Sequence, residues 1–107
     1  MSLIIELKQL LTKEHLVDAF TLVQIPSKNF YDQVSCEITE ETRPILDQVL
    51  RERQRKIMYN AQYHDLSNEI EEKLSNEEVI LYKTIRDAIS NYQDQTRSLK
   101  YVSGFSL

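Results

Sequence analysis

The sequence predicts an all-α protein, a helical bundle of about four to five helices with the two long helices toward the C-terminus. The 107-residue chain has a single glycine and two prolines, which leaves little room for the turns of a β-sheet. Apolar residues recur at helical spacing in several segments. Hydrophobic residues make up 41% of the chain, which is enough for one small core. We therefore expect one helical domain at residues 1–100 and a short tail at 101–107.

The first expected element is a helix over residues 3–11, where the leucines follow helical spacing. A polar break is expected at residues 12–15. Residues 16–26 have mixed periodicity. They can either extend a helix or run as an extended connector, because Ile25 precedes Pro26 and is therefore biased away from the helical conformation.

A short helix follows, with Ser27 as its expected N-cap and Ile38 at its end. Phe30, Val34 and Ile38 recur every four residues and form its apolar stripe.

The first long helix is expected to start at about Arg43. Thr42 is its candidate cap, and Pro44 is tolerated in the first turn, where a backbone N–H has no helical partner. We expect this helix to run to about Leu66, and it could reach Leu74.

The second long helix has the clearest start signal. Ser75 and Glu78 form a capping box, in which each side chain accepts a hydrogen bond from the other residue's backbone N–H. The helix is expected to end near Lys100. Its apolar stripe consists of Leu81, Tyr82, Ile85, Ala88, Ile89, Tyr92, Thr96 and Leu99.

Residues 50–62 place four cationic side chains close together in a chain whose net charge is −4. At about 100° per residue, Arg51 and Arg55 fall opposite the apolar stripe, and Lys56 falls at its edge. Arg53 falls inside the stripe. We expect Arg51 and Arg55 to be solvated. For Arg53 we expect a buried or interfacial carboxylate partner, with snorkelling of its stem past the core edge as the alternative.

The acidic balance and a pI of about 5.2 argue against a dedicated DNA-binding protein. A small helical nucleic-acid-binding protein that uses Arg51 and Arg55 is kept as the alternative function. The single cysteine, Cys36, cannot form an internal disulfide. No apolar run approaches the roughly 18–20 residues of a membrane span, and the first residues lack the features of a signal peptide. We expect a soluble, cytoplasmic protein that does not contact a membrane.

No catalytic or metal site is predicted. His15, Cys36 and His64 are far apart and lack the spacing of metal ligands. We expect His15 at the surface and the other two residues half-buried. A single glycine excludes the phosphate-binding loops of nucleotide-binding proteins. We expect no enzymatic activity and no cofactor.

Acidic residues cluster between positions 69 and 78. Glu69 and Glu72 share a helix face, like the E-x-x-E pairs with which all-α pyrophosphohydrolases bind Mg²⁺. Such a site needs a second acidic pair on a facing helix, and the nearby candidate, Glu77 with Glu78, already serves as a helix cap. We expect a solvated acidic turn, and a helical phosphohydrolase is the third hypothesis.

Three segments, taken in order, resemble an archaeal subunit of GINS, the accessory complex of the replicative helicase. Residues 25–34 (IPSKNFYDQV) resemble the family's entry into its second helix. Residues 50–61 (LRERQRKIMYNA) resemble its long-helix pattern, and residues 74–89 (LSNEEVILYKTIRDAI) resemble the start of its last helix.

The resemblance implies a helical A-domain at residues 1–100 that packs against a GINS paralogue or a second copy in a four-subunit assembly. Such assemblies bridge the MCM helicase and a RecJ-like protein, contact DNA only indirectly, and are nucleoid-associated in the cytoplasm. GINS subunits usually carry a second, β-rich B-domain. Either this chain is a truncated A-domain or its lineage lost the B-domain, and residues 101–107 are a tail or linker remnant.

The expected function is therefore non-catalytic scaffolding through helix–helix interfaces. By position, the resemblance makes Phe30 and Tyr31 anchors of the second helix. Tyrosine and arginine are favoured as contact residues because they dominate interface energetics. The candidate interface or structural residues are Phe30, Tyr31, Arg53, Lys56, Ile57, Tyr82, Ile85 and Tyr92.

Overall fold

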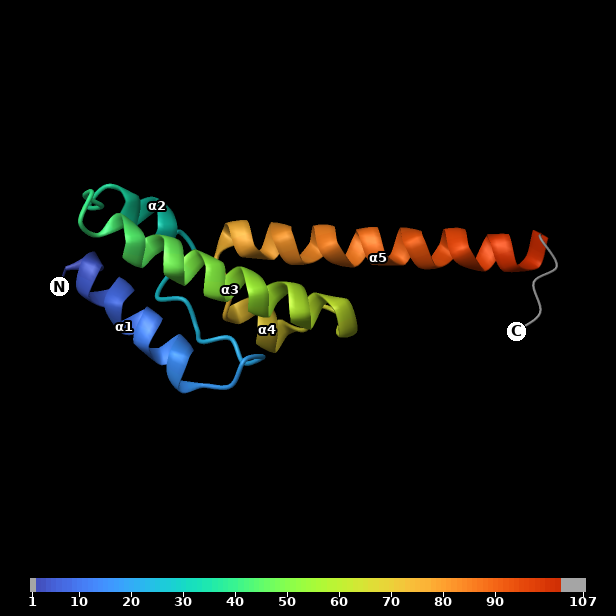
Figure 1. The fold of residues 1–107 in the computed structure, drawn as a ribbon, viewed down its shortest axis with the longest axis horizontal. Helices are drawn as coiled ribbons and strands as arrows, with labels where there is room; N and C mark the ends of the chain where they lie inside the picture. The colour runs from blue at the N-terminus through green and yellow to red at the C-terminus, as the bar shows by residue number, and fades with distance from the viewer. Residues whose placement is uncertain (1, 103–107) are drawn as a thin grey trace.

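The structure is a computed structural model that describes residues 2–102, with side chains as far as residue 97. It contains five helices: α1 (Leu3–Leu16), α2 (Phe30–Ser35), α3 (Arg43–Tyr63), α4 (Asn68–Glu72) and α5 (Asn76–Val102) (Figure 1). No β-strand occurs within residues 2–102. The prediction of an all-α bundle with two long helices toward the C-terminus is confirmed.

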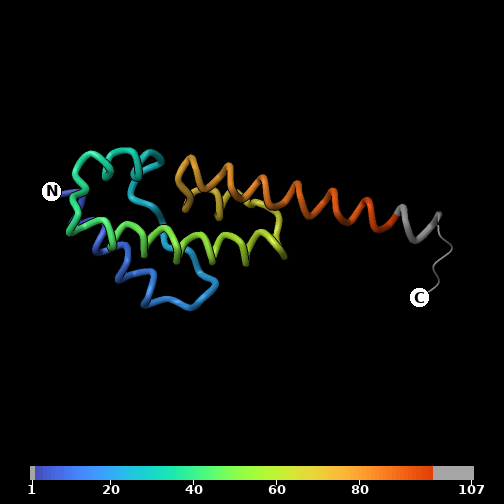
Figure 2. Tube along the Cα trace, turned by 45° about the horizontal axis from the view of Figure 1, so that its top comes forward, coloured from blue at the N-terminus to red at the C-terminus, as the bar shows by residue number. Residues whose placement is uncertain are grey.

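Helix α3 is the centre of the bundle. It packs against α1 on one side and against the first half of α5 on the other, while α2 packs against α1. Figure 2 shows that the second half of α5 extends past the end of α3 and leaves the bundle. The molecule is therefore long and narrow, with extents of 61 × 25 × 25 Å.

The buried side chains form two apolar clusters along α3. One cluster fills the space between α1, α2, α3 and the connector, and consists of Leu7, Leu10, Ile25, Phe30, Val34 and Val49. The other lies where α3 meets α5, and consists of Leu22, Ile57, Ala61, Leu74 and Tyr82. Val49 and Ile57 belong to different clusters, and Arg53 lies one turn from each of them on the same stripe of α3.

Helix α1 continues through the predicted polar break at residues 12–15 and ends at Leu16. The prediction of a break was wrong, because Glu14 is not at the surface. It is buried together with Leu7 and Leu10 on one face of the helix. The ambiguous segment that follows is an extended connector rather than a helix, and the backbone N–H of Ile25 donates to Lys73 O at 3.1 Å.

Helix α2 is shorter than predicted and runs from Phe30 to Ser35. Asn29, not Ser27, occupies the N-cap position, and the Ser27 hydroxyl donates to Gln33 Oε1 instead. Thr42 does occupy the N-cap position of α3, but its side chain does not cap the helix. Its Oγ1 accepts a hydrogen bond from Thr39 N at 2.9 Å. Pro44 lies in the first turn of α3, as predicted.

Helix α3 ends at Tyr63, so the prediction that it reaches Leu66 or Leu74 was wrong. Two side chains of α5 satisfy carbonyl groups at its end: the Tyr82 hydroxyl donates to His64 O at 2.7 Å, and Arg86 Nη1 donates to Ala61 O at 3.0 Å. The chain then turns into the separate helix α4, whose N-cap is Ser67. These tertiary hydrogen bonds satisfy carbonyl groups that another turn of α3 would otherwise have bonded, so the helix can end at Tyr63.

Helix α5 begins as the capping box predicts. Ser75 N donates to Glu78 Oε1 at 2.9 Å, and Glu78 N donates to Ser75 Oγ at 3.2 Å. The helix continues to Val102, two residues past the predicted end. The side chain of Leu99, part of the predicted stripe, and the tail after residue 102 lie outside the described residues.

Candidate assembly interfaces

Arg53 is completely buried, with 0% of its surface exposed. Its guanidinium forms a bidentate ion pair with Glu78, with Nε–Oε2 at 2.7 Å and Nη2–Oε1 at 2.8 Å. The remaining donors reach two backbone carbonyls, those of Val23 and Lys73. The carboxylate partner expected for Arg53 is therefore Glu78, in the first turn of α5.

Glu78 has a second task besides capping α5. Its carboxylate accepts a hydrogen bond of 2.7 Å from the Tyr31 hydroxyl as well as the two from Arg53. Burial raises the pKa of Glu78, but the hydrogen bonds and the charge of Arg53 outweigh burial and hold this pKa below its ordinary value of 4.5. Burial and the negative charge of Glu78 raise the pKa of Tyr31, so its phenol stays protonated and donates.

A second buried pair lies beside the first. Lys56 Nζ donates to Glu14 O at 2.9 Å and lies 3.5 Å from Glu14 Oε1. The Glu14 carboxylate accepts a hydrogen bond from Val23 N at 2.7 Å, and its Oε2 lies 3.7 Å from Arg53 Nη1. Lys56 was predicted at the edge of the stripe but is buried, because its ammonium group is hydrogen-bonded to and paired with Glu14.

We call Glu14, Tyr31, Arg53, Lys56 and Glu78 the ionic cluster. Its two positive and two negative charges balance, so the buried group is neutral. It joins α1, α2, α3 and α5, and it lies between the two apolar clusters. Glu14 was not among the predicted residues, although it continues the spacing of Leu7 and Leu10 on α1.

The predicted interface or structural residues separate into inner and outer groups. Among those outside the ionic cluster, Phe30, Ile57 and Tyr82 are buried in the apolar clusters, and Ile85 is partly buried against the second. Tyr92 is 66% exposed. Arg51 and Arg55 are exposed as predicted, and Arg55 pairs with Glu52.

No group of three or more histidine, cysteine, aspartate or glutamate side chains is arranged to hold a metal ion in the described part of the chain. His15 is exposed, as predicted, whereas the prediction of half-buried positions for Cys36 and His64 was wrong, because both lie in exposed segments after a helix end. Glu69 and Glu72 are exposed. Glu78 is buried, so the prediction that it belongs to a solvated acidic turn was wrong.

Within residues 2–102, no helix is both long and apolar enough to cross a membrane.

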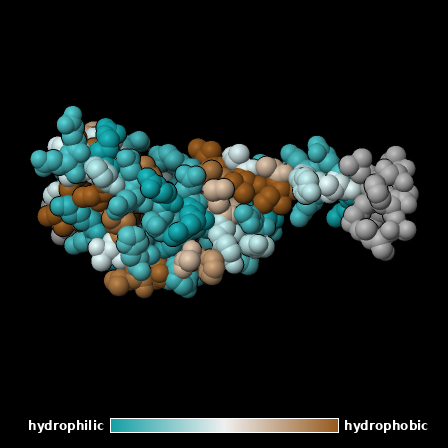
Figure 3. Space-filling view, viewed as in Figure 1, coloured by the Kyte–Doolittle hydropathy of each residue, from teal (hydrophilic) through white to brown (hydrophobic). Residues whose placement is uncertain are grey.

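The outer half of α5 continues the stripe of the helix past the part that packs on the bundle, with Ile89 and Tyr92 as its apolar members among the described side chains. Ile85 is the last stripe residue packed against a core cluster. Ile89 and Thr96 are half-buried and Tyr92 is exposed, all on the face that Tyr82 and Ile85 begin. Figure 3 shows apolar surface over the first half of α5 up to the point where the helix leaves the bundle, and mostly hydrophilic surface on the described part beyond it.

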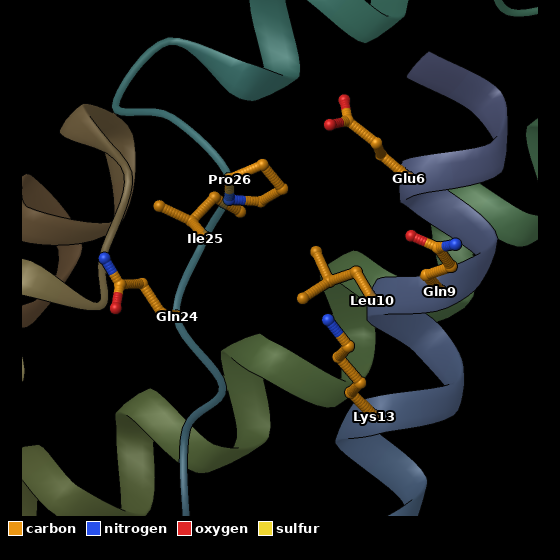
Figure 4. A pocket seen from close by; sticks show the side chains of 7 residues that line it. All are labelled: Glu6, Gln9, Leu10, Lys13, Gln24, Ile25 and Pro26. Atoms are coloured by element: carbon orange, nitrogen blue, oxygen red, sulfur yellow. The ribbon is translucent and has the colours of Figure 1, made fainter. Parts of the chain in front are cut away.

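A shallow groove of about 300 Å³ runs between α1 and the connector (Figure 4). The buried side chains of Leu10 and Ile25 form its base, and Glu6 and Lys13 lie toward its two ends. Its remaining lining residues are Gln9, Gln24 and Pro26. An open groove of this kind suits a contact with a protein surface better than the enclosure of a small molecule.

Comparison with known families gives one match. The family model described as "Sld5: GINS complex protein helical bundle domain" matches residues 4–97. No curated protein and no solved structure matches the chain. The matched residues include the whole ionic cluster and the described side chains of α5. The chain therefore belongs to the GINS family, in which it carries the Sld5-type helical bundle domain.

Proposed function

We propose that this chain is a non-catalytic subunit of a GINS DNA-replication complex and that it meets other subunits through the outer half of α5. Membership of the GINS family supports the first part, because the family's helical bundle domain belongs to subunits of that complex. The exposed stripe of α5 supports the second part.

The uncovered stripe is the observation that carries the proposal. Helix α5 has 27 residues, about 40 Å at 1.5 Å per residue. Only its first turns pack against α3, where Tyr82 is buried. Ile85 is the last stripe residue packed against the bundle, and beyond it Ile89, Tyr92 and Thr96 continue at the spacing with which one helix packs against another. An amphipathic helix that extends from its own bundle gains stability when a second helix covers its apolar face.

The inner residues of the predicted set act on this interface indirectly. Arg53 binds Glu78 in the first turn of α5, and Tyr31 binds the same carboxylate. The start of α5 is thereby joined to α2 and α3. We propose that Phe30, Lys56, Ile57 and Tyr82 complete this support and that Ile85 and Tyr92 make the contact with the partner.

The partner in our proposal is a GINS paralogue or a second copy of this chain. The assembled complex would link the MCM helicase to a RecJ-like protein in an archaeal cytoplasm, associated with the nucleoid, and would contact DNA only through those proteins. The resemblance of residues 25–34, 50–61 and 74–89 to archaeal GINS subunits supports this assignment. In the same scheme residues 1–100 are the A-domain.

Size-exclusion chromatography with light scattering tests the proposal, on the chain alone and mixed with a GINS paralogue from the same organism. The unmodified chain is expected to form a complex. The double variant Ile89→Gln, Tyr92→Gln should lose it, because glutamine keeps the helix propensity and removes the apolar surface.

The matched control is Ser90→Gln, Asn91→Gln, which places two glutamines on the other faces of the same turn. This variant should assemble like the unmodified chain. A chain that stays monomeric and gains no partner, or a control that loses assembly as fully as the stripe variant, would refute the proposal.

A further inference from the structure

The outer face of α3, which is turned away from α1 and α5, carries a second uncovered apolar surface. A shallow hollow of about 400 Å³ lies on it. Met58 and Tyr59 are exposed there, at 44% and 38%. All residues that line the hollow come from this one helix: Arg51, Gln54, Arg55, Met58, Tyr59 and Gln62.

Three aromatic rings extend this surface toward the end of α3. The ring of Tyr59 stacks on that of Phe20, with centroids 4.0 Å apart, and Tyr63 lies against Tyr59 at 5.3 Å. Phe20 is 50% exposed and Tyr63 is 65% exposed. Exposed aromatic side chains that are already ordered contribute much to binding because little conformational entropy is lost.

The connector holds Phe20 in place. Asp18 Oδ1 accepts hydrogen bonds from Phe20 N at 2.9 Å and from Thr21 N at 2.8 Å. Asn60 Nδ2, from α3, donates to Phe20 O at 2.8 Å. Hydrogen bonds from the connector and from α3 therefore hold the backbone of Phe20, whose ring stacks on Tyr59.

The charged side chains beside this surface indicate which kind of molecule can bind to it. Arg55 is paired with Glu52, and Lys56 is buried in the ionic cluster. Arg51 is exposed and takes part in no ion pair among the side chains that the structure describes. The surface thus offers one free guanidinium next to apolar and aromatic groups. A nucleic-acid strand needs several cations along its path, whereas this surface offers only one guanidinium that is unpaired among the described side chains.

We propose that the outer face of α3 docks an amphipathic helix of a partner protein, one whose apolar stripe is flanked by carboxylates. The stripe covers Met58 and Tyr59, one apolar side chain enters the hollow, and a carboxylate pairs with Arg51. This face is separate from the stripe of α5, so the inference goes beyond the proposed subunit contact and gives the chain a second binding surface.

The experiment uses the ¹⁵N-labelled 107-residue chain and follows amide chemical shifts during titration. The first probe is a synthetic helical peptide with leucines at i, i+3, i+4 and i+7 and glutamates beside the stripe. The second has lysines in place of the glutamates, and the third is single-stranded oligo-dT. The glutamate peptide is expected to cause saturable shifts of the amides of residues 51–63 and Phe20. The lysine peptide and oligo-dT are expected to cause no such shifts.

Variants sharpen the test. Arg51→Glu should reverse the preference, so that the lysine peptide binds and the glutamate peptide does not. Tyr59→Ala should weaken the binding of the glutamate peptide by about tenfold or more, as for a contact residue at the centre of an interface. Arg43→Glu, an exposed arginine in the first turn of the same helix, is the control and should change neither result.

Three results would overturn the inference. The first is the absence of saturable shifts with the glutamate peptide. The second is a shift of the same amides by oligo-dT that Arg51→Glu abolishes, which would make the face a nucleic-acid platform. The third is a set of shifts confined to residues 89–96, which would place the peptide on α5 and leave the proposed function standing while this inference fails.

Discussion

Replacement of Arg53 by alanine tests the ionic cluster most directly. The substitution leaves the Glu78 carboxylate buried without its guanidinium and removes the donors to the carbonyls of Val23 and Lys73. Removal of one partner from a buried ion pair costs about 3–5 kcal/mol. The total stability of a domain is about 5–15 kcal/mol, so Arg53→Ala should remove a large part of it.

Urea unfolding followed by circular dichroism measures this loss. Arg51→Ala, on the exposed face of the same helix, is the control and should change the free energy of unfolding by no more than about 0.5 kcal/mol. The double variant Arg53→Met, Glu78→Gln removes both charges and keeps a residue that can cap α5. It should recover a substantial part of the loss. Equal and small effects of Arg53→Ala and Arg51→Ala would refute the buried position of Arg53.

Two further results follow from the same cluster. The pKa of Glu78 is lowered in the folded chain, so its contribution to stability is complete above the ordinary value of 4.5 and is lost as the pH falls through the lower, folded value. Urea midpoints measured from about pH 6 to about pH 3 should therefore fall less steeply in Glu78→Gln than in the unmodified chain, and identical slopes would contradict this. Ser75→Ala removes the buried cap of α5 and should cost about 1–2 kcal/mol, more than Ser67→Ala at the exposed cap of α4. Thermal unfolding would contradict the reasoning if Ser67→Ala were the more harmful change.

The parts of the fold that the sequence predicted are those that depend on neighbouring residues. The capping box of Ser75 and Glu78 and the position of Pro44 in the first turn of α3 are local signals, and both hold. The inward direction of Arg53 follows from helix geometry alone, since it shares a stripe with Val49 and Ile57. Periodicity therefore located the arginine inside the bundle.

The partners of these residues could not be predicted in the same way, because they come from distant segments. Glu14 looked like part of a polar break, but it is buried because the ammonium group of Lys56 pairs with its carboxylate and Val23 N of the connector donates a hydrogen bond to the same carboxylate. Lys56 is buried for the reciprocal reason. That Glu78 serves both as a cap and as an ion-pair partner depends on how α5 returns to α3, which local sequence does not encode.

The stripe of α5 shows a further limit of periodicity. Tyr82 and Tyr92 follow the same spacing, yet the first is buried in the second apolar cluster and the second is exposed. An apolar stripe indicates which side of a helix seeks a neighbour, but it does not indicate whether that neighbour lies in the same chain.

The two halves of α5 should also differ in how their backbone opens. Amide hydrogens near Tyr82 are covered by α3, so they exchange with solvent only when the bundle unfolds. Between Ile89 and Arg97 the helix is held mainly by its own hydrogen bonds, and such a segment opens by local fraying at a much smaller free-energy cost. Hydrogen exchange should therefore become faster along the helix, and a partner that covers the outer stripe should abolish the gradient. Subunit association would then stabilise the outer half of α5, which in the single chain is held mainly by its own backbone hydrogen bonds.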